Sequence, residues 1–340
     1  RQSRDAAYRD APSGITVPSL ASASPSIAVS IITLASWLDL RKKQFWMDNS
    51  GTTQRASHRP IGTMAKEMRM RDLSVGELFG VKGKTVIVTG GAKGIGLMIA
   101  AGYVANGANV YIASRSKDVC EAAAKRLTQE GPGTCVALSE DLSTEAGCVN
   151  LAKMFRAKED RLHVLVNNSG TSWGAPLEKH SEKGWDKVYA LNVKGIFFLT
   201  RELLPALDAG STATDPARVI NIGSIAGQRP QVFPTYSYDV SKAAVHHLTH
   251  KLADELADRR QKGGHSITVN AIAPGYVPSA MSDSLAMYKE SEEIARSGIP
   301  LRRKGAPGDM AGAALFLSSN AGAWITGTTV RVDGGFLAKL

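Results

Sequence analysis

The sequence predicts an α/β fold in which helices cover both faces of a parallel sheet. From Val81 onward, short apolar runs rich in β-branched residues alternate with helical patterns, which is typical of a doubly wound sheet. A glycine-rich turn, TGGAKGIG at residues 89–96, follows the first run and opens a helical stretch. The composition is globular, with 43% hydrophobic and 21% charged residues. We therefore expect a single domain rather than the two that 340 residues would allow.

The expected sheet has seven strands. Each is a short apolar run bounded by Gly, Asn, Pro or Ser, and the segments between the runs are long enough for a covering helix. In chain order the strands are expected at Lys84–Val88, Asn109–Ala113, Thr134–Leu138, His163–Val166, Arg218–Ile222, Ser266–Ala271 and Thr329–Val332.

The chain is expected to divide at residue 80. Residues 1–79 are rich in Ser, Thr, Ala and Arg, and we expect a low-order N-terminal extension there, either a targeting segment or the product of a misassigned start. Its one apolar run, Ile27–Leu38, is shorter than the roughly 20 residues that a membrane span needs. Residues 80–340 form the expected catalytic domain.

Charge and cysteine content exclude several classes of protein. The net charge is +10 and the pI about 9.5, but no polybasic tract concentrates this charge, so a nucleic-acid surface is not expected. The three cysteines are an odd number without CxxC spacing, so neither a disulfide framework nor a zinc knuckle is indicated, and a reducing intracellular compartment fits best.

The glycine-rich turn predicts a dinucleotide site. Gly90, Gly94 and Gly96 let the backbone approach a pyrophosphate, and the following helix supplies N–H donors and the positive end of its dipole. After the next strand stand Ser114 and Arg115, where a site for NAD usually places an acidic residue. Lys93 inside the turn and Arg115 after the strand could together hold a 2′-phosphate, which favours NADP(H). The alternative is that they are solvated loop cations.

A second group of residues carries acid–base chemistry. Tyr238 and Lys242 in YDVSK share one face of a helix, since they are four residues apart. An ammonium beside a phenol favours phenolate, so Lys242 is expected to lower the pKa of Tyr238 towards neutrality. The hydroxyl of Ser224 is placed to hydrogen-bond a carbonyl oxygen. A Tyr and a Lys at this spacing also occur on ordinary solvated helices, so the pair indicates a reactive site only through its order and context among the other motifs of the chain.

Taken together, these motifs resemble the short-chain dehydrogenase/reductase family over roughly residues 80–337. The matching pieces follow the family's order: TGGAKGIG, Asp141-Leu142, NNSG at 167–170, Asn192 in LNVKG, Ser224, YDVSK, Asn270 with APGYVPS, and VDGG at 332–335. The resemblance implies a Rossmann fold, an oxidoreductase activity and a homotetramer or homodimer. This chain differs in having Ser169 where Ala is common in the family and Ser279 where Thr is common.

The resemblance also assigns roles to matched positions. The reactive group would be Ser224, Tyr238 and Lys242, with Asn192 holding a water in the proton relay. NADP(H) would be bound by the turn, the strand ends, Tyr238 and Lys242 and the segment that embraces the nicotinamide: Thr89, Gly90, Lys93, Gly94, Ile95, Gly96, Ser114, Arg115, Asp141, Leu142, Asn167, Asn168, Gly170, Pro274, Gly275, Val277 and Ser279. The implied reaction transfers hydride to a carbonyl carbon while Tyr238 protonates the oxygen.

The substrate is less constrained than the reaction. GTSWGAPLE, DLSTEAG and DPARVINIGSIAG resemble the NADPH-dependent 3-oxoacyl reductases of rhamnolipid formation and their fungal relatives, which implies a 3-oxoacyl thioester, on CoA or an acyl carrier. A polyketide, other small ketone or sugar carbonyl is the alternative, and a non-catalytic NADP-binding regulator is the alternative of another class. Trp173, Phe233, Pro234 and Tyr236 either line an apolar cleft or serve packing. Residues 277–299 are expected to act as a substrate-covering lid.

Two remaining features concern metal binding and location. His246 and His250 are one helical turn apart, but no third ligand accompanies them, so no metal site is expected. The chain ends Ala338-Lys339-Leu340, a near match to the SKL address, which predicts peroxisomal delivery with the cytoplasm as the alternative.

Overall fold

The computed structural model describes residues 70–259, 263–279 and 297–338. Residues 1–69 of the expected extension, 280–296 of the expected lid, and Lys339 and Leu340 of the terminal tripeptide lie outside these ranges. Within the described residues, no helix is long and apolar enough to cross a membrane. Residues 70–79, assigned to the extension from the sequence, form the 3₁₀ helix η3 (Met70–Leu73) and α2 (Val75–Phe79). The Asn320 side chain donates to the Glu77 carbonyl at 2.9 Å, so this segment packs with the domain.

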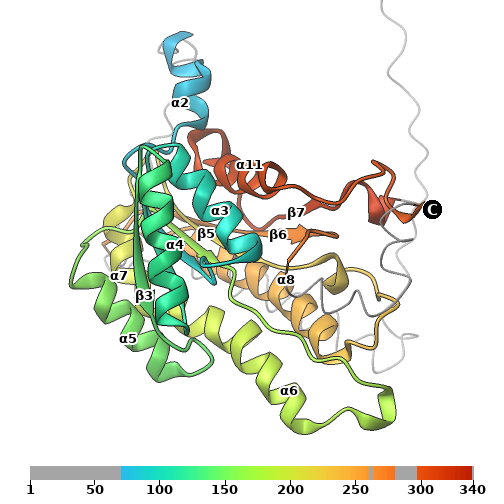
Figure 1. Ribbon diagram of the computed structural model, residues 1–340. Coiled ribbons are helices and arrows are strands. Elements are labelled where there is room, and N and C mark those ends of the chain that lie inside the picture. Colours follow the sequence, from blue (N-terminus) through green and yellow to red (C-terminus); the bar gives the residue numbers. More distant parts are fainter. Residues whose placement is uncertain (1–69, 260–262, 280–296, 339–340) are drawn as a thin grey trace, which may run out of the picture. The chain divides into compact units, whose positions relative to one another are not determined.

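The expected seven-stranded sheet is confirmed (Figure 1). All six strand pairs are parallel, in the order β3-β2-β1-β4-β5-β6-β7. The strands are β1 (Thr85–Thr89), β2 (Asn109–Ser114), β3 (Thr134–Ser139), β4 (Val164–Asn167), β5 (Ala217–Ile222), β6 (Ile267–Pro274) and β7 (Thr329–Val332). Chain order reverses between β1 and β4, and ligands bind at such a switch point, outside the carboxyl ends of the strands.

Only the sixth strand departs clearly from expectation. The sequence predicts its end at Ala271, but the strand continues to Pro274, because Ala271–Pro274 pair with Thr329–Val332 of the last strand. Proline lacks an N–H and is tolerated at a strand end. The extension carries the backbone three residues further and delivers Pro274, Gly275 and the following residues to the edge where the site lies.

Helices fill the segments between the strands and cover both faces. They are α3 (Gly94–Ala105), α4 (Lys117–Glu130), α5 (Glu145–Arg156), α6 (Glu182–Tyr189), α7 (Gly195–Gly210), α8 (Tyr236–Leu256) and α11 (Pro307–Ser318), and their arrangement can be followed in Figure 1. Short helical turns are η4 (Leu177–Lys179), η5 (Ala190–Lys194), η6 (Ile225–Gly227), η9 (Asn320–Gly322) and η10 (Phe336–Ala338).

Alternating side chains of the strands build two cores. Val86 and Val88 of β1 enter a cluster with residues of α3, α4 and α11, whereas Ile87 between them enters a cluster with residues of α5, α7 and α8. Successive strand residues point to opposite faces, so this division is the one expected of a sheet covered on both sides. Every residue of β1, β4, β5 and β6 is buried, which fixes the loops at their carboxyl ends.

Candidate active site

A cavity of about 390 Å³ opens at the carboxyl ends of the strands. The turns after β1 to β6 and the start of α8 contribute to its wall. Most residues expected at the cofactor or the reacting group line it, namely Gly90, Lys93, Gly94, Ile95, Ser114, Arg115, Asp141, Leu142, Asn168, Gly170, Ser224, Tyr238, Lys242, Pro274, Gly275, Val277 and Ser279. Thr89, Gly96, Asn167 and Asn192 are not among the described lining residues.

The glycine-rich turn has the backbone that the sequence required. Gly90 and Gly94 have φ of +66° and +57°, a region that side chains other than glycine rarely adopt. At Gly96 a Cβ would stand 2.3 Å from the Gly90 carbonyl oxygen, so only glycine lets the first turn of α3 close against the loop. The helix begins here, and its N-terminal N–H groups and dipole suit a phosphate.

Hydrogen bonds of Thr89 connect the start of this turn to the residues that follow β4. Its hydroxyl accepts hydrogen bonds from the backbone N–H groups of Asn168 and Ser169, both at 2.9 Å. The Asn168 side chain in turn donates to the Thr89 carbonyl at 2.8 Å. The ends of β1 and β4 are thus locked together. Asn167 is turned away from the cavity, donating to Thr200 and to Asn221 at 2.9 Å.

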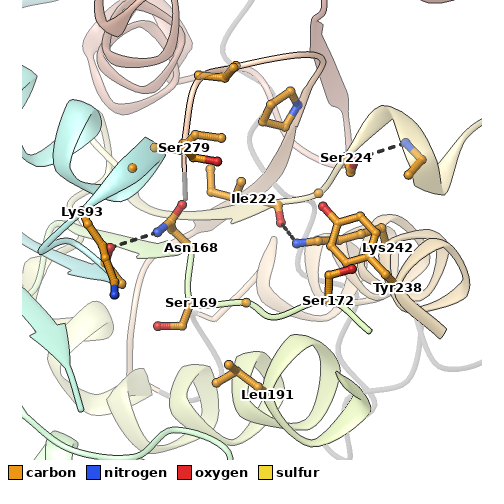
Figure 2. Close-up of a pocket in the computed structure, with 18 of the residues that line it drawn as sticks. Lys93, Asn168, Ser169, Ser172, Leu191, Ile222, Ser224, Tyr238, Lys242 and Ser279 are labelled. Atoms are coloured by element: carbon orange, nitrogen blue, oxygen red, sulfur yellow. Dashed lines mark hydrogen bonds between the residues drawn. The ribbon is translucent and has the colours of Figure 1, made fainter. Parts of the chain in front are cut away.

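The expected reactive group meets on the opposite wall (Figure 2). Lys242 Nζ donates to the Ile222 carbonyl oxygen at 2.7 Å and lies 5.6 Å from the centre of the Tyr238 ring. The Ser224 hydroxyl caps η6 by accepting from the Ala226 N–H at 3.1 Å. Its other hydrogen bond is with the Tyr238 side chain, so the hydroxyl faces the reactive tyrosine. Lys93 lies on the other side of the cavity from Tyr238.

This geometry is matched by proteins of known class. Residues 90–337 match the family described as Enoyl-(Acyl carrier protein) reductase. The rhamnolipids biosynthesis 3-oxoacyl-[acyl-carrier-protein] reductase of Pseudomonas aeruginosa is 44% identical over 258 residues, covering 76% of this chain and 98% of that protein. The chain belongs to the short-chain dehydrogenase/reductase family. The resemblance expected from the motifs is therefore confirmed.

Two further similarities agree with this family. The short-chain dehydrogenase/reductase PhomF of Diaporthe leptostromiformis is 33% identical over 287 residues, covering 78% of this chain and 95% of that protein. The structure described as the Pseudomonas aeruginosa RhlG/NADP active-site complex superposes with a TM-score of 0.71 at 44% identity, covering 76% of this chain and 98% of that one. Both the rhamnolipid-type and the fungal resemblance were expected.

The proton affinities in this dehydrogenase/reductase differ from the sequence expectation. Burial raises the pKa of Tyr238, opposed by its hydrogen bond with Ser224 and reinforced by the Asp239 carboxylate. Burial also lowers the pKa of Lys242 to about 8, so it loses its proton more readily than an ordinary lysine, although the ammonium is still the main form at pH 7. The expected downward shift is therefore not found in this structure: burial is the largest influence on the pKa of Tyr238 and raises it.

Asn192 sits beside this group rather than in the cavity wall. It is fully buried in η5, a π-helical turn. Its side chain accepts from the Thr171 N–H at 2.8 Å and donates to the Thr171 carbonyl and the Ser241 hydroxyl, each at 3.0 Å. Its side-chain oxygen and Lys242 Nζ both come near Gly170, so it is within reach of the reactive group. A relay role for Asn192 stays a prediction.

The substrate side of the cavity is only partly the one expected. Of the four anticipated residues, Phe233 lines the cavity, whereas Trp173, Pro234 and Tyr236 are not among the described lining residues. Trp173 packs on Gly184 and Tyr236 on His180. Sequence reasoning missed several lining side chains, namely Ser172, Leu191, Gln231, Thr235 and Asp239, whereas Tyr276 lies within the stretch expected at the nicotinamide.

Asp239 is the one of these that the sequence could most readily have indicated, because it follows Tyr238 directly in the first turn of α8. It accepts from the Thr235 hydroxyl at 2.9 Å and the Gln231 N–H at 3.4 Å, and so ties the loop before α8 to the helix. Burial raises its pKa. In the described part of the chain, no cluster of His, Cys, Asp and Glu is arranged to hold a metal.

Proposed function

We propose that this dehydrogenase/reductase reduces a ketone with NADPH, and that the ketone is the 3-oxo group of an acyl thioester. One observation carries the proposal: a single cavity has Ser224, Tyr238 and Lys242 on one side and the glycine-rich turn with Lys93 and Arg115 on the other. A regulator without turnover would have no need of the first set.

The cavity fits NADP(H) chemically. The glycine-rich turn and the N-terminus of α3 suit the pyrophosphate, and Lys93 and Arg115 would hold the 2′-phosphate as charge-assisted partners. Asp141 and Leu142 would adjoin the adenine, and Pro274 to Ser279 the nicotinamide. When bound, NADPH supplies the hydride that reduces the carbonyl carbon.

The chain's own residues handle the oxygen. A raised pKa keeps Tyr238 protonated at neutral pH, so it serves as the acid that gives a proton to the carbonyl oxygen. The Ser224 hydroxyl orients that oxygen and stabilises its developing charge. Lys242 fixes the geometry by joining α8 to the end of β5, and its easily lost proton suits it to resupply Tyr238.

The thioester assignment rests on the relatives named as 3-oxoacyl reductases. A hydroxylated carbonyl compound is the second candidate, because Gln231, Thr235 and Asp239 place polar groups on the same wall. The test is oxidation of NADPH and NADH against acetoacetyl-CoA, longer 3-oxoacyl thioesters, polyketide ketones and sugars. Turnover of 3-oxoacyl thioesters with NADPH is expected. A preference for sugars would favour the hydroxylated carbonyl compound as substrate. If no ketone is reduced at all, a non-catalytic NADP-binding regulator becomes the better interpretation.

Assembly, lid and location remain proposals from the sequence. A homotetramer or homodimer is checked by light scattering of the full chain, and a substrate-covering segment at 277–299 by protease protection on adding NADPH and substrate. Peroxisomal delivery through Ala338-Lys339-Leu340 is checked with a fluorescent fusion that lacks Leu340, where unchanged punctate import would contradict the signal.

A further inference from the structure

One face of α8 carries three titratable side chains spaced four residues apart: Tyr238, Lys242 and His246. The first two line the cavity. His246 does not, yet it is 8% exposed, whereas His247 and His250 on the same helix are exposed to solvent. A buried histidine directly behind a reactive pair needs a structural explanation, since neither a metal nor the cavity accounts for it in the described residues.

The imidazole of His246 lies against the backbone that carries Ser224. The Ser224 N–H donates to His246 Nε2 at 3.4 Å. At the preceding residue, Gly223, a Cβ would stand 2.2 Å from the same nitrogen. The turn therefore closes over the imidazole only because residue 223 is glycine. The Gly223 N–H donates to the Ile272 carbonyl at 2.8 Å, so the backbone next to Ser224 is also anchored to β6.

The histidine is suited to accept this bond. Burial, then the nearby Lys242 and His250, lower the pKa of His246 to about 4, so the ring is neutral at neutral pH. For Nε2 to accept, the ring proton must reside on Nδ1. The bond is long, which makes it weak as it stands, but the Ser224 N–H is buried and His246 is the acceptor that the structure provides.

We propose that His246 is a positioning residue for Ser224, fixing the turn from which the Ser224 hydroxyl points into the cavity. The inference rests on the proposed function, in which that hydroxyl orients the carbonyl oxygen. Ser224 is then held at two points: its N–H by His246 and its hydroxyl oxygen by the Ala226 N–H. With both fixed, the hydroxyl is held beside Tyr238, with which it hydrogen-bonds, at the place where the reacting oxygen would lie.

The test is a double-mutant cycle on the full chain with NADPH and the best ketone of the panel. His246→Leu removes the acceptor and is expected to lower kcat about tenfold while leaving the Kd of NADPH unchanged. His246→Gln keeps an acceptor of similar reach and is expected to restore most of the rate. In a Ser224→Ala background, His246→Leu is expected to have no further effect, because His246 acts through that hydroxyl. His247→Leu, on the exposed face, is the matched control.

Two results would overturn the inference: a kcat of His246→Leu equal to that of the wild type, or the same tenfold loss with and without Ser224. The latter would mean that His246 serves only the packing of α8. Hydrogen exchange of the Ser224 amide gives a readout independent of turnover, with slow exchange expected in the wild type and His247→Leu and fast exchange in His246→Leu. If the wild type reduces no ketone, the proposed function fails, and equal exchange rates would reject the contact separately.

Discussion

Lys242 Nζ donates to the carbonyl oxygen of Ile222 at 2.7 Å and so joins the reactive face of α8 to the last residue of β5. Ser224 follows two residues later, so the same bond sets the separation between the serine-bearing turn and Tyr238. The buried ammonium that makes this bond is costly, because burial disfavours its charged form. The reactive group is therefore a place where stability is given up for geometry.

Replacing the Tyr238 hydroxyl is expected to abolish turnover while sparing the cofactor. Tyr238→Phe removes the proposed proton donor, and general acid catalysis of this kind contributes about 10²- to 10⁴-fold. We expect kcat to fall by at least about 10²-fold with an unchanged Kd for NADPH, measured by cofactor fluorescence. Tyr236→Phe is the control, since Tyr236 is on the same helix, 41% exposed and outside the described cavity wall. Near-normal turnover of Tyr238→Phe would reject the assignment.

Removing the buried charge of Lys242 is expected to stabilise the fold. The pKa of about 8 in the folded chain lies below the ordinary lysine value of 10.5, a difference worth about 3 kcal/mol, and loss of the Ile222 bond offsets about 1 kcal/mol of this. Lys242→Met should therefore be inactive yet more stable by about 2 kcal/mol at pH 7. Lys251→Met, on the exposed face of α8, is the control.

Because burial lowers the pKa of Lys242, the stability gained by Lys242→Met is expected to depend on pH. Between pH 8 and 10.5 the unfolded chain binds the Lys242 proton and the folded chain does not, so wild-type stability rises through this window. The advantage of Lys242→Met is full below pH 8 and shrinks as the pH approaches 10.5. Thermal melts of both proteins across pH 7–10.5 measure it, and a constant difference would show that burial of the charge is not its cause.

Cofactor preference is expected to depend on Arg115. It lines the cavity after β2, where Arg115→Asp would repel a 2′-phosphate and accept from a 2′-hydroxyl instead. Loss of a charge-assisted bond predicts a KM for NADPH at least about tenfold higher, with a smaller change for NADH. Arg126→Ala, which removes a solvent-exposed arginine of α4, is the control. A wild type active with NADH alone would contradict the roles of Lys93 and Arg115.

The sequence located the sheet well because each strand is a short apolar run ending at a turn residue, and parallel strands covered on both faces must be apolar throughout. It also located the residues that meet at the cavity, since Gly90, Ser224 and Tyr238 lie in motifs of fixed order. It misjudged what depends on the folded environment. The pKa of Tyr238 is raised by burial, which only the fold determines. Asp239 lines the cavity because it is bonded to the loop before α8. His246 packs against the Ser224 turn because Gly223, 23 residues earlier in the chain, leaves room for its ring.

The glycine-rich turn offers a matched pair of glycine substitutions. Gly96→Ala would place a Cβ 2.3 Å from the Gly90 carbonyl oxygen and 2.4 Å from Asn168 Nδ2, so the turn and its bond to β4 must shift. We expect weaker NADPH binding and a lower melting temperature. Gly312 lies inside α11, and a Cβ added there would meet no atom within 4 Å, so Gly312→Ala should stabilise the protein by about 0.5–1 kcal/mol through its helix preference. Calorimetry and NADPH titration of both variants separate the two effects, since one alanine clashes and the other does not. Tight NADPH binding by Gly96→Ala would mean that the turn does not have to keep this shape to hold the cofactor.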